Sequence, residues 1–531
     1  MVGQALHIVY RVLEGGTPCT MVQVPEAMRM FGRDRICAVV AATDAGGMWR
    51  QLLRALRDTR TVELRLDWLA SDAEIVRFLG EFGARRPGGT FIATCRRRQA
   101  GGRYRGSIAK QVIYLAEALR AGCAWCDLEV ETAVACPREL LDTLLGDGRR
   151  LTSAHFFRAA PPNPRRVVVQ LEQTKSHAVK IAAQCDSLGE SLRLLQLARV
   201  SRSRVVVPMG DAALPARVLA LRQGSALAYA PVEEVTAPGQ VSLDELKHVY
   251  RAGCLTRRTR VYGVIGNPVG HSFSPQLQNA GFQARRINAV HLPFLVRDLR
   301  DFLRAIEPLG IAGFSVTLPH KEAILRHLDG CDPLAAAIGA VNTVVVRAKG
   351  ELYGYNTDYV GVLRALERRM PLRGSRVLIL GAGGAARAVA FALAQAGAAV
   401  CICARRPERA KRLARAVGGE AVARARIRHE FFDAIVNATP VGMYPLVGQS
   451  PLSGRELNCR LVFDTIYRPQ KTKLLQLTAR RGIETVSGVE MFVAQGTAQW
   501  EIWTGERAPI EPMRRAVLRV LEREDRIDAA R

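Results

Sequence analysis

Short strand-like segments alternate with helical patterns through the first half of the chain. The strand-like segments are residues 36–42, 61–69, 89–95, 124–130, 150–156, 178–183, 203–210 and 225–232. Between them, segments such as EIVRFLGEF (74–82) and AKQVIYLAEALRA (109–121) have apolar residues at helical spacing. Eight strands with interleaved helices predict a (β/α)8 barrel, a fold that places its chemistry at the carboxyl ends of the strands.

Polar residues interrupt these otherwise apolar strands. Glu63, Arg65 and Asp67 alternate along the second strand, so their side chains share one face. The remaining polar positions are Arg96, which ends the third strand, Asp127 and Glu129 in the fourth, His155 at the end of the fifth and Lys180 in the sixth. Each alone is explained equally well by a structural salt bridge inside the barrel. Together they predict a catalytic site on one rim.

Lys180 lies in the middle of the apolar run HAVKIAA (177–183) and has two interpretations. Most lysines in apolar runs lie at strand ends and extend the ammonium group to water. Alternatively, burial of an amine favours its neutral form, which can attack a carbonyl carbon. The local sequence leaves both open, and the histidine and arginines on the same rim favour the second.

The second half contains a glycine-rich turn between a strand and a helix, VLILGAGGAARAVAFALA (377–394). This context lets backbone N–H groups and a helix N-terminus bind a pyrophosphate, so we expect cofactor contacts from Gly381, Ala382, Gly383, Gly384 and Ala385.

The next strand, AVCICA, is followed by Arg405 and Arg406, with Arg409 a turn later. An NAD site typically has an acid there for the ribose diol, so the basic residues favour the 2′-phosphate of NADP. The alternative is that these arginines only begin an exposed helix.

A second group of polar residues lies between the barrel and the glycine-rich turn. Its members are Ser272, Ser274, Lys321, Asn342, Thr343, Asn356 and Asp358. Hydroxyls, amides, one lysine and one carboxylate suit the recognition of a polyhydroxylated acid.

The first half resembles the type I 3-dehydroquinate dehydratases. ELRLD (63–67), TCR (94–96), GGxYxG (101–106), SAH (153–155), VKIA (179–182) and TAPGQ (236–240) occur in order, over residues 34–248. The resemblance implies that Lys180 forms an imine with the substrate ketone and that His155 shuttles protons for the loss of water. It also implies a set of substrate-binding residues, namely Glu63, Arg65, Arg96, Arg217, Thr236 and Gln240.

This half departs from the family pattern at two positions near the histidine. The family usually has a glutamate directly before the glycine pair, where it orients the catalytic histidine, and this chain has Ala100. Phe156 follows His155, where a polar residue is common. Either Glu129 or Asp127 takes over the orienting role, or this active site is slower.

The second half resembles shikimate dehydrogenase over residues 259–523. HSFSP, VTLPHK, AVNT, NTD, GAGGAARA, NATPVGM, DTIYRP and MFVAQG occur in that order. The resemblance implies that Lys321 and Asp358 form the catalytic pair and that Asp358 also contacts substrate. Further substrate contacts are implied for Ser272, Ser274, Thr317, Asn342, Tyr467 and Gln495. One departure is the usual NRT of the adenosine pocket, which here is Ala404, Arg405 and Arg406.

The two resemblances predict an α/β protein that carries out consecutive steps. Dehydration of 3-dehydroquinate gives 3-dehydroshikimate, which NADPH then reduces to shikimate.

We expect an N-terminal tail over 1–33, the barrel over 34–250 and a linker over 251–259. The linker is followed by a shikimate-binding domain over 260–370 and a Rossmann NADP-binding domain over 371–495. The last segment, 496–531, is expected to be helical and to pack back on the substrate domain.

Composition limits the other function classes. The net charge is +27, but the excess arginine is spread along the chain without an aromatic-interleaved basic motif, so we expect small anionic substrates and no nucleic-acid partner. CAWC (123–126) lacks the second pair that a zinc site needs, so no metal is expected.

No apolar run approaches the roughly 20 residues of a membrane span, and the opening residues do not resemble a signal peptide. We therefore expect a cytoplasmic protein; the sequence does not indicate its oligomeric state.

Three rival functions remain open at this point. Nucleic-acid binding is one of them and follows only from the net charge. The second half could prefer quinate and NAD, which would give a catabolic enzyme. The chain could also be a ligand-sensing regulator built from inactive copies of both domains, although Lys180, His155, Lys321 and Asp358 argue against loss of activity.

Overall fold

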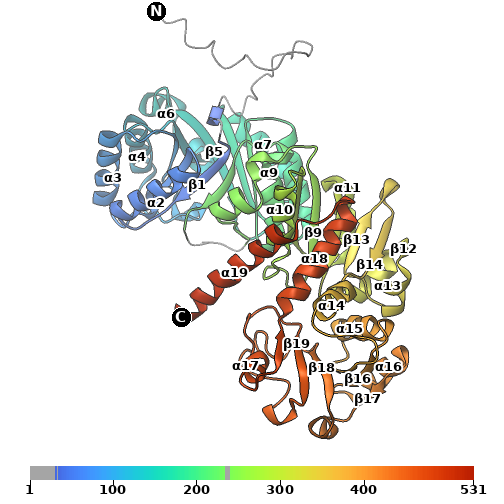
Figure 1. The fold of residues 1–531 in the computed structure, drawn as a ribbon. Helices are drawn as coiled ribbons and strands as arrows, with labels where there is room; N and C mark the ends of the chain where they lie inside the picture. Colours follow the sequence, from blue (N-terminus) through green and yellow to red (C-terminus); the bar gives the residue numbers. More distant parts are fainter. Residues whose placement is uncertain (1–29, 33, 234–238, 531) are drawn as a thin grey trace, which may run out of the picture.

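The structure is a computed structural model that describes residues 30–32, 34–233 and 239–530. It contains three sheets, which follow one another along the chain (Figure 1). The tail expected over residues 1–33 lies outside the described residues except for 30–32. Within that short piece, Phe31 is fully buried and stacks on Trp125, with the ring centroids 4.2 Å apart. Because Trp125 begins its strand, Phe31 packs at the amino-terminal end of the first sheet.

The first sheet is the predicted parallel barrel. Its strands are β1 (Ile36–Val40), β2 (Thr61–Arg65), β3 (Thr90–Thr94), β4 (Trp125–Glu129), β5 (Arg149–Phe156), β6 (Ala178–Gln184), β7 (Arg204–Met209) and β8 (Ala228–Pro231). They are hydrogen-bonded in the order β7-β6-β5-β4-β3-β2-β1-β8. The ring is nearly closed between its end strands, where the Ala226 N–H donates to the Arg204 carbonyl at 2.8 Å.

Helices surround the barrel, and polar side chains fix where several of them begin. The helices are α2 (Ala45–Asp58), α3 (Asp72–Arg85), α4 (Ile108–Arg120), α5 (Val130–Ala135), α6 (Arg138–Leu145), α7 (Pro164–Gln173), α8 (Leu188–Gln196) and α9 (Leu214–Gln223). Ser71, Ser107 and Ser187 each accept a hydrogen bond from an amide in the first turn of α3, α4 and α8. Such caps satisfy backbone donors that the helix itself leaves unpaired.

The second sheet is mixed and has the order β10-β9-β11-β13-β14-β12. Its strands are β9 (Arg260–Gly266), β10 (Ala289–Leu295), β11 (Ile311–Val316), β12 (Gly330–Cys331), β13 (Thr343–Val346) and β14 (Leu352–Tyr355). β9, β10 and β11 are parallel, whereas β13 pairs antiparallel with both β11 and β14. Its helices are α10 (Ser274–Ala284), α11 (Leu299–Leu309), α12 (His320–Ala323), α13 (Pro333–Ile338) and α14 (Asp358–Leu366).

The third sheet has the Rossmann-like arrangement that the glycine-rich turn predicts. Its strands are β15 (Arg376–Leu380), β16 (Ala399–Cys403), β17 (Glu420–Ala421), β18 (Phe432–Asn437), β19 (Cys459–Asp464) and β20 (Glu484–Val486). All are parallel, in the order β17-β16-β15-β18-β19-β20. The helices α15 (Gly384–Gln395), α16 (Pro407–Val417) and α17 (Lys473–Ala479) belong to this unit.

Two long helices follow the third sheet, and the first of them runs from the third sheet to the second (Figure 1). α18 (Gly488–Thr504) runs without interruption through residues 495 and 496, where we expected a domain boundary. The Trp503 indole at its end donates to the Val344 carbonyl in β13 at 3.1 Å. α19 (Ile510–Ala530) packs against α10. Met513 of α19 belongs to the same apolar cluster as Trp500 of α18.

The barrel contacts the second unit where α8 packs against α11. Asp301 of α11 accepts from the amides of Leu188 and Gly189, at the start of α8, at 3.0 and 3.4 Å. The Arg297 guanidinium donates to the Asp186 carbonyl at 3.1 Å. The second half therefore holds the loop that follows β6, the strand of Lys180. Within the described residues, no helix combines the length and apolarity that a membrane crossing requires.

Candidate active sites

Lys180 lies inside the barrel and does not reach solvent. The residue is 4% exposed, and its ammonium forms ion pairs with Asp127 and, at 3.4 Å, with Glu63. The ammonium also lies 4.5 Å from the centroid of the Tyr229 ring. A lysine that extends to water is therefore excluded.

Asp127 connects the lysine to His155 through Arg96. Asp127 Oδ2 accepts from Arg96 Nη2 at 2.9 Å, and the other guanidinium nitrogen, Nη1, lies 2.8 Å from His155 Nδ1. Ser153 completes the arrangement, since its hydroxyl donates to Asp127 Oδ1 at 2.5 Å and accepts from Arg96 Nη1 at 3.2 Å. These groups come from neighbouring strands of the barrel: Arg96 follows β3, Asp127 lies in β4, and Ser153 and His155 lie two residues apart in β5.

The charges in this cluster shift two pKa values. Burial alone would raise the pKa of Asp127, but Arg96 and Lys180 hold it well below its usual range. Burial, followed by the positive charges of Arg96 and Lys180, holds the pKa of His155 well below its ordinary value of 6.5. At neutral pH the carboxylate is therefore ionised and the imidazole is neutral.

The other predicted residues of the barrel site differ in their surroundings. Glu63 accepts from Thr94 at 2.8 Å, and Arg65 forms two hydrogen bonds with Asp67, at 2.9 and 2.8 Å. Arg217 is buried in the first turn of α9, and burial lowers its pKa to about 10. Gln240 is partly exposed. Thr236 lies outside the described residues.

Tyr229 is a residue that the sequence interpretation missed in this site. Tyr229 carries the only polar group in β8 (AYAP), which could have marked it as a member of the site. Its burial raises the pKa of its hydroxyl, so the phenol stays neutral beside Lys180.

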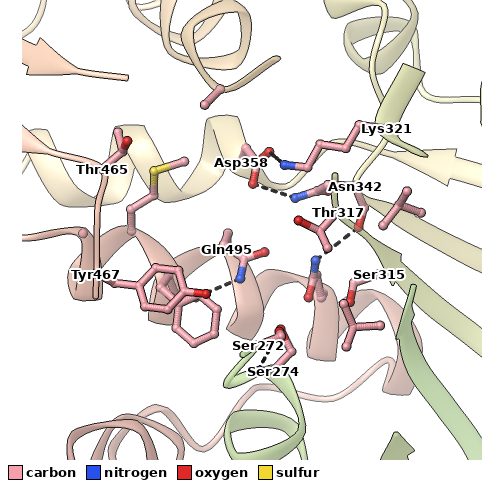
Figure 2. Close-up of a pocket in the computed structure, with 17 residues that line it drawn as sticks. Ser272, Ser274, Ser315, Thr317, Lys321, Asn342, Asp358, Thr465, Tyr467 and Gln495 are labelled. Carbon is pink, nitrogen blue, oxygen red and sulfur yellow. Dashed lines mark hydrogen bonds and ion pairs between the residues drawn. The ribbon is translucent and has the colours of Figure 1, made fainter. Parts of the chain in front are cut away.

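The second site is a cavity of about 200 Å³ between the second and third sheets (Figure 2). All eight residues predicted for substrate binding and catalysis line it, namely Ser272, Ser274, Thr317, Lys321, Asn342, Asp358, Tyr467 and Gln495. Ser315, Thr465, Met491 and Gln499 also line it and were not predicted. Alternation along β11 could have indicated Ser315, which is two residues before Thr317.

Lys321 and Asp358 form a direct ion pair in this cavity. Lys321 Nζ lies 2.5 Å from Asp358 Oδ2, and the Asn342 amide donates to Asp358 Oδ1 at 2.8 Å. Asp358 is the first residue of α14, where the amide end of the helix favours a negative charge. The amide and the helix thus fix the carboxylate, and the carboxylate fixes the lysine. Figure 2 shows this pair on one side of the cavity and Tyr467 on the other.

The glycine-rich turn has the shape that a dinucleotide needs. Gly381 has φ +114°, and a Cβ there would lie 2.9 Å from the Ala438 carbonyl oxygen, so only glycine fits. Gly383 and Gly384, at the start of α15, face open space on the side where a Cβ would point. Ala382 lies in the same turn, and Ala385 lines the substrate cavity, which places this turn beside it.

The three arginines expected at the 2′-phosphate follow β16. Arg405, Arg406 and Arg409 are all exposed, and none forms an ion pair with a carboxylate among residues 30–32, 34–233 and 239–530. Their guanidinium groups are therefore available to an anionic ligand. Within the same residues, no cluster of three or more His, Cys, Asp or Glu could hold a metal ion.

Comparison with protein families gives matches to both halves. Residues 36–253 match the model of type I 3-dehydroquinase, and residues 264–344 match the shikimate dehydrogenase substrate binding domain. Residues 364–443 match shikimate / quinate 5-dehydrogenase, and residues 488–518 match the shikimate 5'-dehydrogenase C-terminal domain. The chain is 34% identical over 501 residues to the bifunctional 3-dehydroquinate dehydratase/shikimate dehydrogenase, chloroplastic, of Arabidopsis thaliana; the match covers 90% of this chain and 83% of the relative.

The chain belongs to the bifunctional 3-dehydroquinate dehydratase/shikimate dehydrogenase family.

Single-function relatives match the second half of this bifunctional chain. The shikimate dehydrogenase (NADP(+)) of Methanothermobacter thermautotrophicus is 41% identical over 285 residues, which are 51% of this chain and 100% of that protein. The crystal structure of shikimate 5-dehydrogenase from Thermus thermophilus in complex with NADP(H) and shikimate is 36% identical, with a TM-score of 0.46. The match covers 49% of this chain and 99% of the Thermus thermophilus chain.

Replacing both Arg405 and Arg406 with alanine tests the NADP assignment. We expect the KM for NADPH to rise about tenfold or more while that for NADH changes little, because only NADPH carries the 2′-phosphate and charge-assisted hydrogen bonds are each worth about 1.5–3 kcal/mol. Arg415→Ala, at the exposed far end of α16, is the matched control. Equal losses for both cofactors would contradict the assignment.

Proposed function

We propose that the barrel dehydrates 3-dehydroquinate to 3-dehydroshikimate and that the second half reduces this product to shikimate with NADPH. The chain would then carry out two consecutive steps of the shikimate pathway, which leads to the aromatic amino acids. The observation that carries the proposal is that each half holds a lysine paired with a buried aspartate. Lys180 pairs with Asp127, and Lys321 pairs with Asp358.

In the barrel, the Lys180 ammonium releases a proton and its amine attacks the substrate ketone. Return of that proton to the adduct lets water leave and gives a protonated imine. The imine withdraws electrons and so acidifies the adjacent C–H bond. His155, neutral in the free site, removes that proton and then donates it to the departing hydroxyl, which leaves as water. A second water hydrolyses the imine and regenerates the Lys180 ammonium. The net change is the loss of one water from the substrate.

Positively charged residues of the barrel suit the carboxylate and hydroxyl groups of the substrate. Arg65, Arg96 and Arg217 are partly or fully buried, and Glu63 lies 3.4 Å from the lysine. We assign substrate contacts to these residues and to Thr236 and Gln240, on the basis of the family resemblance.

In the second half, Lys321 supplies a proton to the reacting oxygen and stabilises the charge that develops there. Asp358 holds the lysine and accepts from a substrate hydroxyl, and Asn342 keeps the carboxylate in place. The hydroxyls of Ser272, Ser274, Thr317 and Tyr467, with the Gln495 amide, line the same cavity and suit the remaining oxygens of the substrate. Burial raises the pKa of Tyr467 to about 12, so its hydroxyl remains a hydrogen-bond donor.

NADPH, when bound, supplies the hydride for this reduction. The turn at Gly381–Ala385 would hold its pyrophosphate, with Arg405, Arg406 and Arg409 at its 2′-phosphate. We also propose a reducing, cytoplasmic compartment, which is supported by the free thiol state of every cysteine in the described residues. Small molecules are the proposed partners, with no role for nucleic acid.

The imine mechanism predicts covalent trapping. Borohydride added together with 3-dehydroquinate should reduce the imine and leave ligand attached to the protein. Peptide mass analysis should place the adduct on Lys180, because its amine is the one buried beside the catalytic histidine. A Lys180→Ala variant is the control and should not be labelled. An adduct on another lysine, or none, is incompatible with the mechanism.

The two activities should be separable by single substitutions. The residues assigned to dehydration lie between Glu63 and Gln240, and those assigned to reduction lie between Ser272 and Gln495. Lys180→Ala should abolish turnover of 3-dehydroquinate and leave reduction of added 3-dehydroshikimate nearly unchanged. Lys321→Ala should lower the reduction by about 10² or more and spare the dehydration.

Each variant in this pair is the folding control for the other, since both activities belong to one chain. If either substitution, in folded protein, disabled both reactions, the two sites would not be independent.

A further inference from the structure

Helix α8 of the barrel begins with a cap that the second half supplies. The Ser187 hydroxyl accepts from the Glu190 amide at 3.2 Å, which satisfies one first-turn donor within the barrel itself. The amides of Leu188 and Gly189 donate instead to Asp301 Oδ2, at 3.0 and 3.4 Å. Amides in the first turn have no partner inside their own helix, and a negative charge is favourable there. Asp301, in the first turn of α11, therefore completes the start of a helix in the other half.

Gly189 allows this close approach. A Cβ at this position would lie 2.8 Å from Asp301 Oδ1, so a side chain there would push the carboxylate away. Arg297 adds a second contact to the same segment, because its Nη1 donates to the Asp186 carbonyl at 3.1 Å. The second half thus holds the backbone of residues 186–189, shortly after β6.

The segment held in this way packs against the turn that follows β7. The Cys185 amide donates to the Met209 carbonyl at 2.9 Å. Gly210 comes next, and a Cβ on it would lie 3.0 Å from the Cys185 carbonyl oxygen and would overlap the side-chain amide of Gln184. The two loops are therefore in direct backbone contact, and a shift of one requires a shift of the other.

The turn after β7 supports two residues that we assign to the substrate. A Cβ on Gly239 would overlap the Gly210 carbonyl oxygen, so the backbone next to Gln240 lies directly on this turn. The same carbonyl accepts from the Ala213 amide at 3.0 Å, just before α9, whose first turn holds Arg217. The positions of Gln240 and Arg217 thus both depend on that of Gly210.

We propose that Asp301 is a positioning residue for the dehydratase site, although it belongs to the dehydrogenase half. Through α8 and the turn after β7, it holds Gln240 and Arg217 where they bind an anionic, hydroxylated substrate. Lys180 and His155 lie in β6 and β5, which are held by strand pairing on both sides and do not need this contact. The effect on dehydration rests on the proposed function, whereas the contact itself is measurable in the free protein.

Hydrogen exchange followed by mass spectrometry tests the contact in the full-length protein without substrate. In Asp301→Ala, amides in residues 184–190 should exchange about tenfold faster or more, because hydrogen bonds to a charged group are lost. Exchange should also become faster in residues 209–217 and stay unchanged in β2 and β3, on the opposite side of the barrel.

Glu307→Ala, which removes an exposed acid from the same helix, is the matched control and should change neither segment. Faster exchange confined to residues 184–190 would overturn the proposal, because Asp301 would then cap α8 without positioning the turn after β7.

The kinetic effect should fall on the KM of the dehydratase. Asp301→Ala should raise the KM for 3-dehydroquinate about three- to thirtyfold, the typical range for mutations that change coupling between sites, with little change in kcat. Asp301→Asn keeps a side-chain oxygen that accepts from the same amides, so its KM should stay closer to that of the unaltered protein. The dehydrogenase activity of each variant should be undiminished, which shows that the half carrying the substitution is folded.

Gly189→Ala tests the contact from the barrel side. Its methyl group should displace the Asp301 carboxylate and raise the KM in the same way, although alanine is a better helix former than glycine. When Gly189→Ala is combined with Asp301→Ala, no carboxylate remains to be displaced. The KM should then be no higher than in Asp301→Ala alone.

The kinetic results separate this proposal from the proposed function. An unchanged KM in Asp301→Ala, in a protein that dehydrates 3-dehydroquinate, would overturn the proposal, and so would additive effects of the two substitutions. Absence of dehydratase activity from the unaltered protein would instead contradict the proposed function. The exchange experiment would still decide whether Asp301 positions the two loops.

Discussion

The buried carboxylate of Asp127 is the contact on which the barrel site depends. It lies among charges that would be costly to bury singly, and it pairs with both Lys180 and Arg96. Through the lysine it fixes the nucleophile, and through the arginine it reaches the histidine. The same positive neighbours that keep Asp127 ionised keep His155 neutral. One ion-paired cluster thus sets both the positions and the protonation states of the reacting groups.

The second half uses a similar pair for a different purpose. Lys321 is partly exposed to the cavity, with a side-chain exposure of 21%, whereas the Lys180 side chain is 5% exposed. A lysine at the cavity surface can reach an oxygen of a bound ligand, and a lysine enclosed in the barrel can reach a carbonyl group held there. The halves meet where Asp301 accepts from the amides at the start of α8. This contact supports the loop after β6 without contributing a group to either reaction.

The sequence predicted the barrel, the Rossmann-like unit and most of the second site, because strand alternation and ordered motifs are local features. The partners within the barrel site could not be predicted. From the sequence, Asp127 and Glu129 were equally good candidates for contact with His155. The register of β3, β4 and β5, together with the side-chain conformations, determines that Asp127 binds Arg96. The burial of Phe31 could not be predicted because the residue on which it stacks, Trp125, is distant in the sequence. Packing across the fold, rather than any local pattern, decides these cases.

The central claim is that both reactions occur in sequence on one chain, and a single assay tests it directly. The purified protein is given 3-dehydroquinate and NADPH, the loss of NADPH absorbance is followed, and the product is identified. The account predicts that NADPH is consumed in a one-to-one ratio with the shikimate that appears. Accumulation of 3-dehydroshikimate without loss of NADPH, or no reaction of 3-dehydroquinate at all, would contradict it.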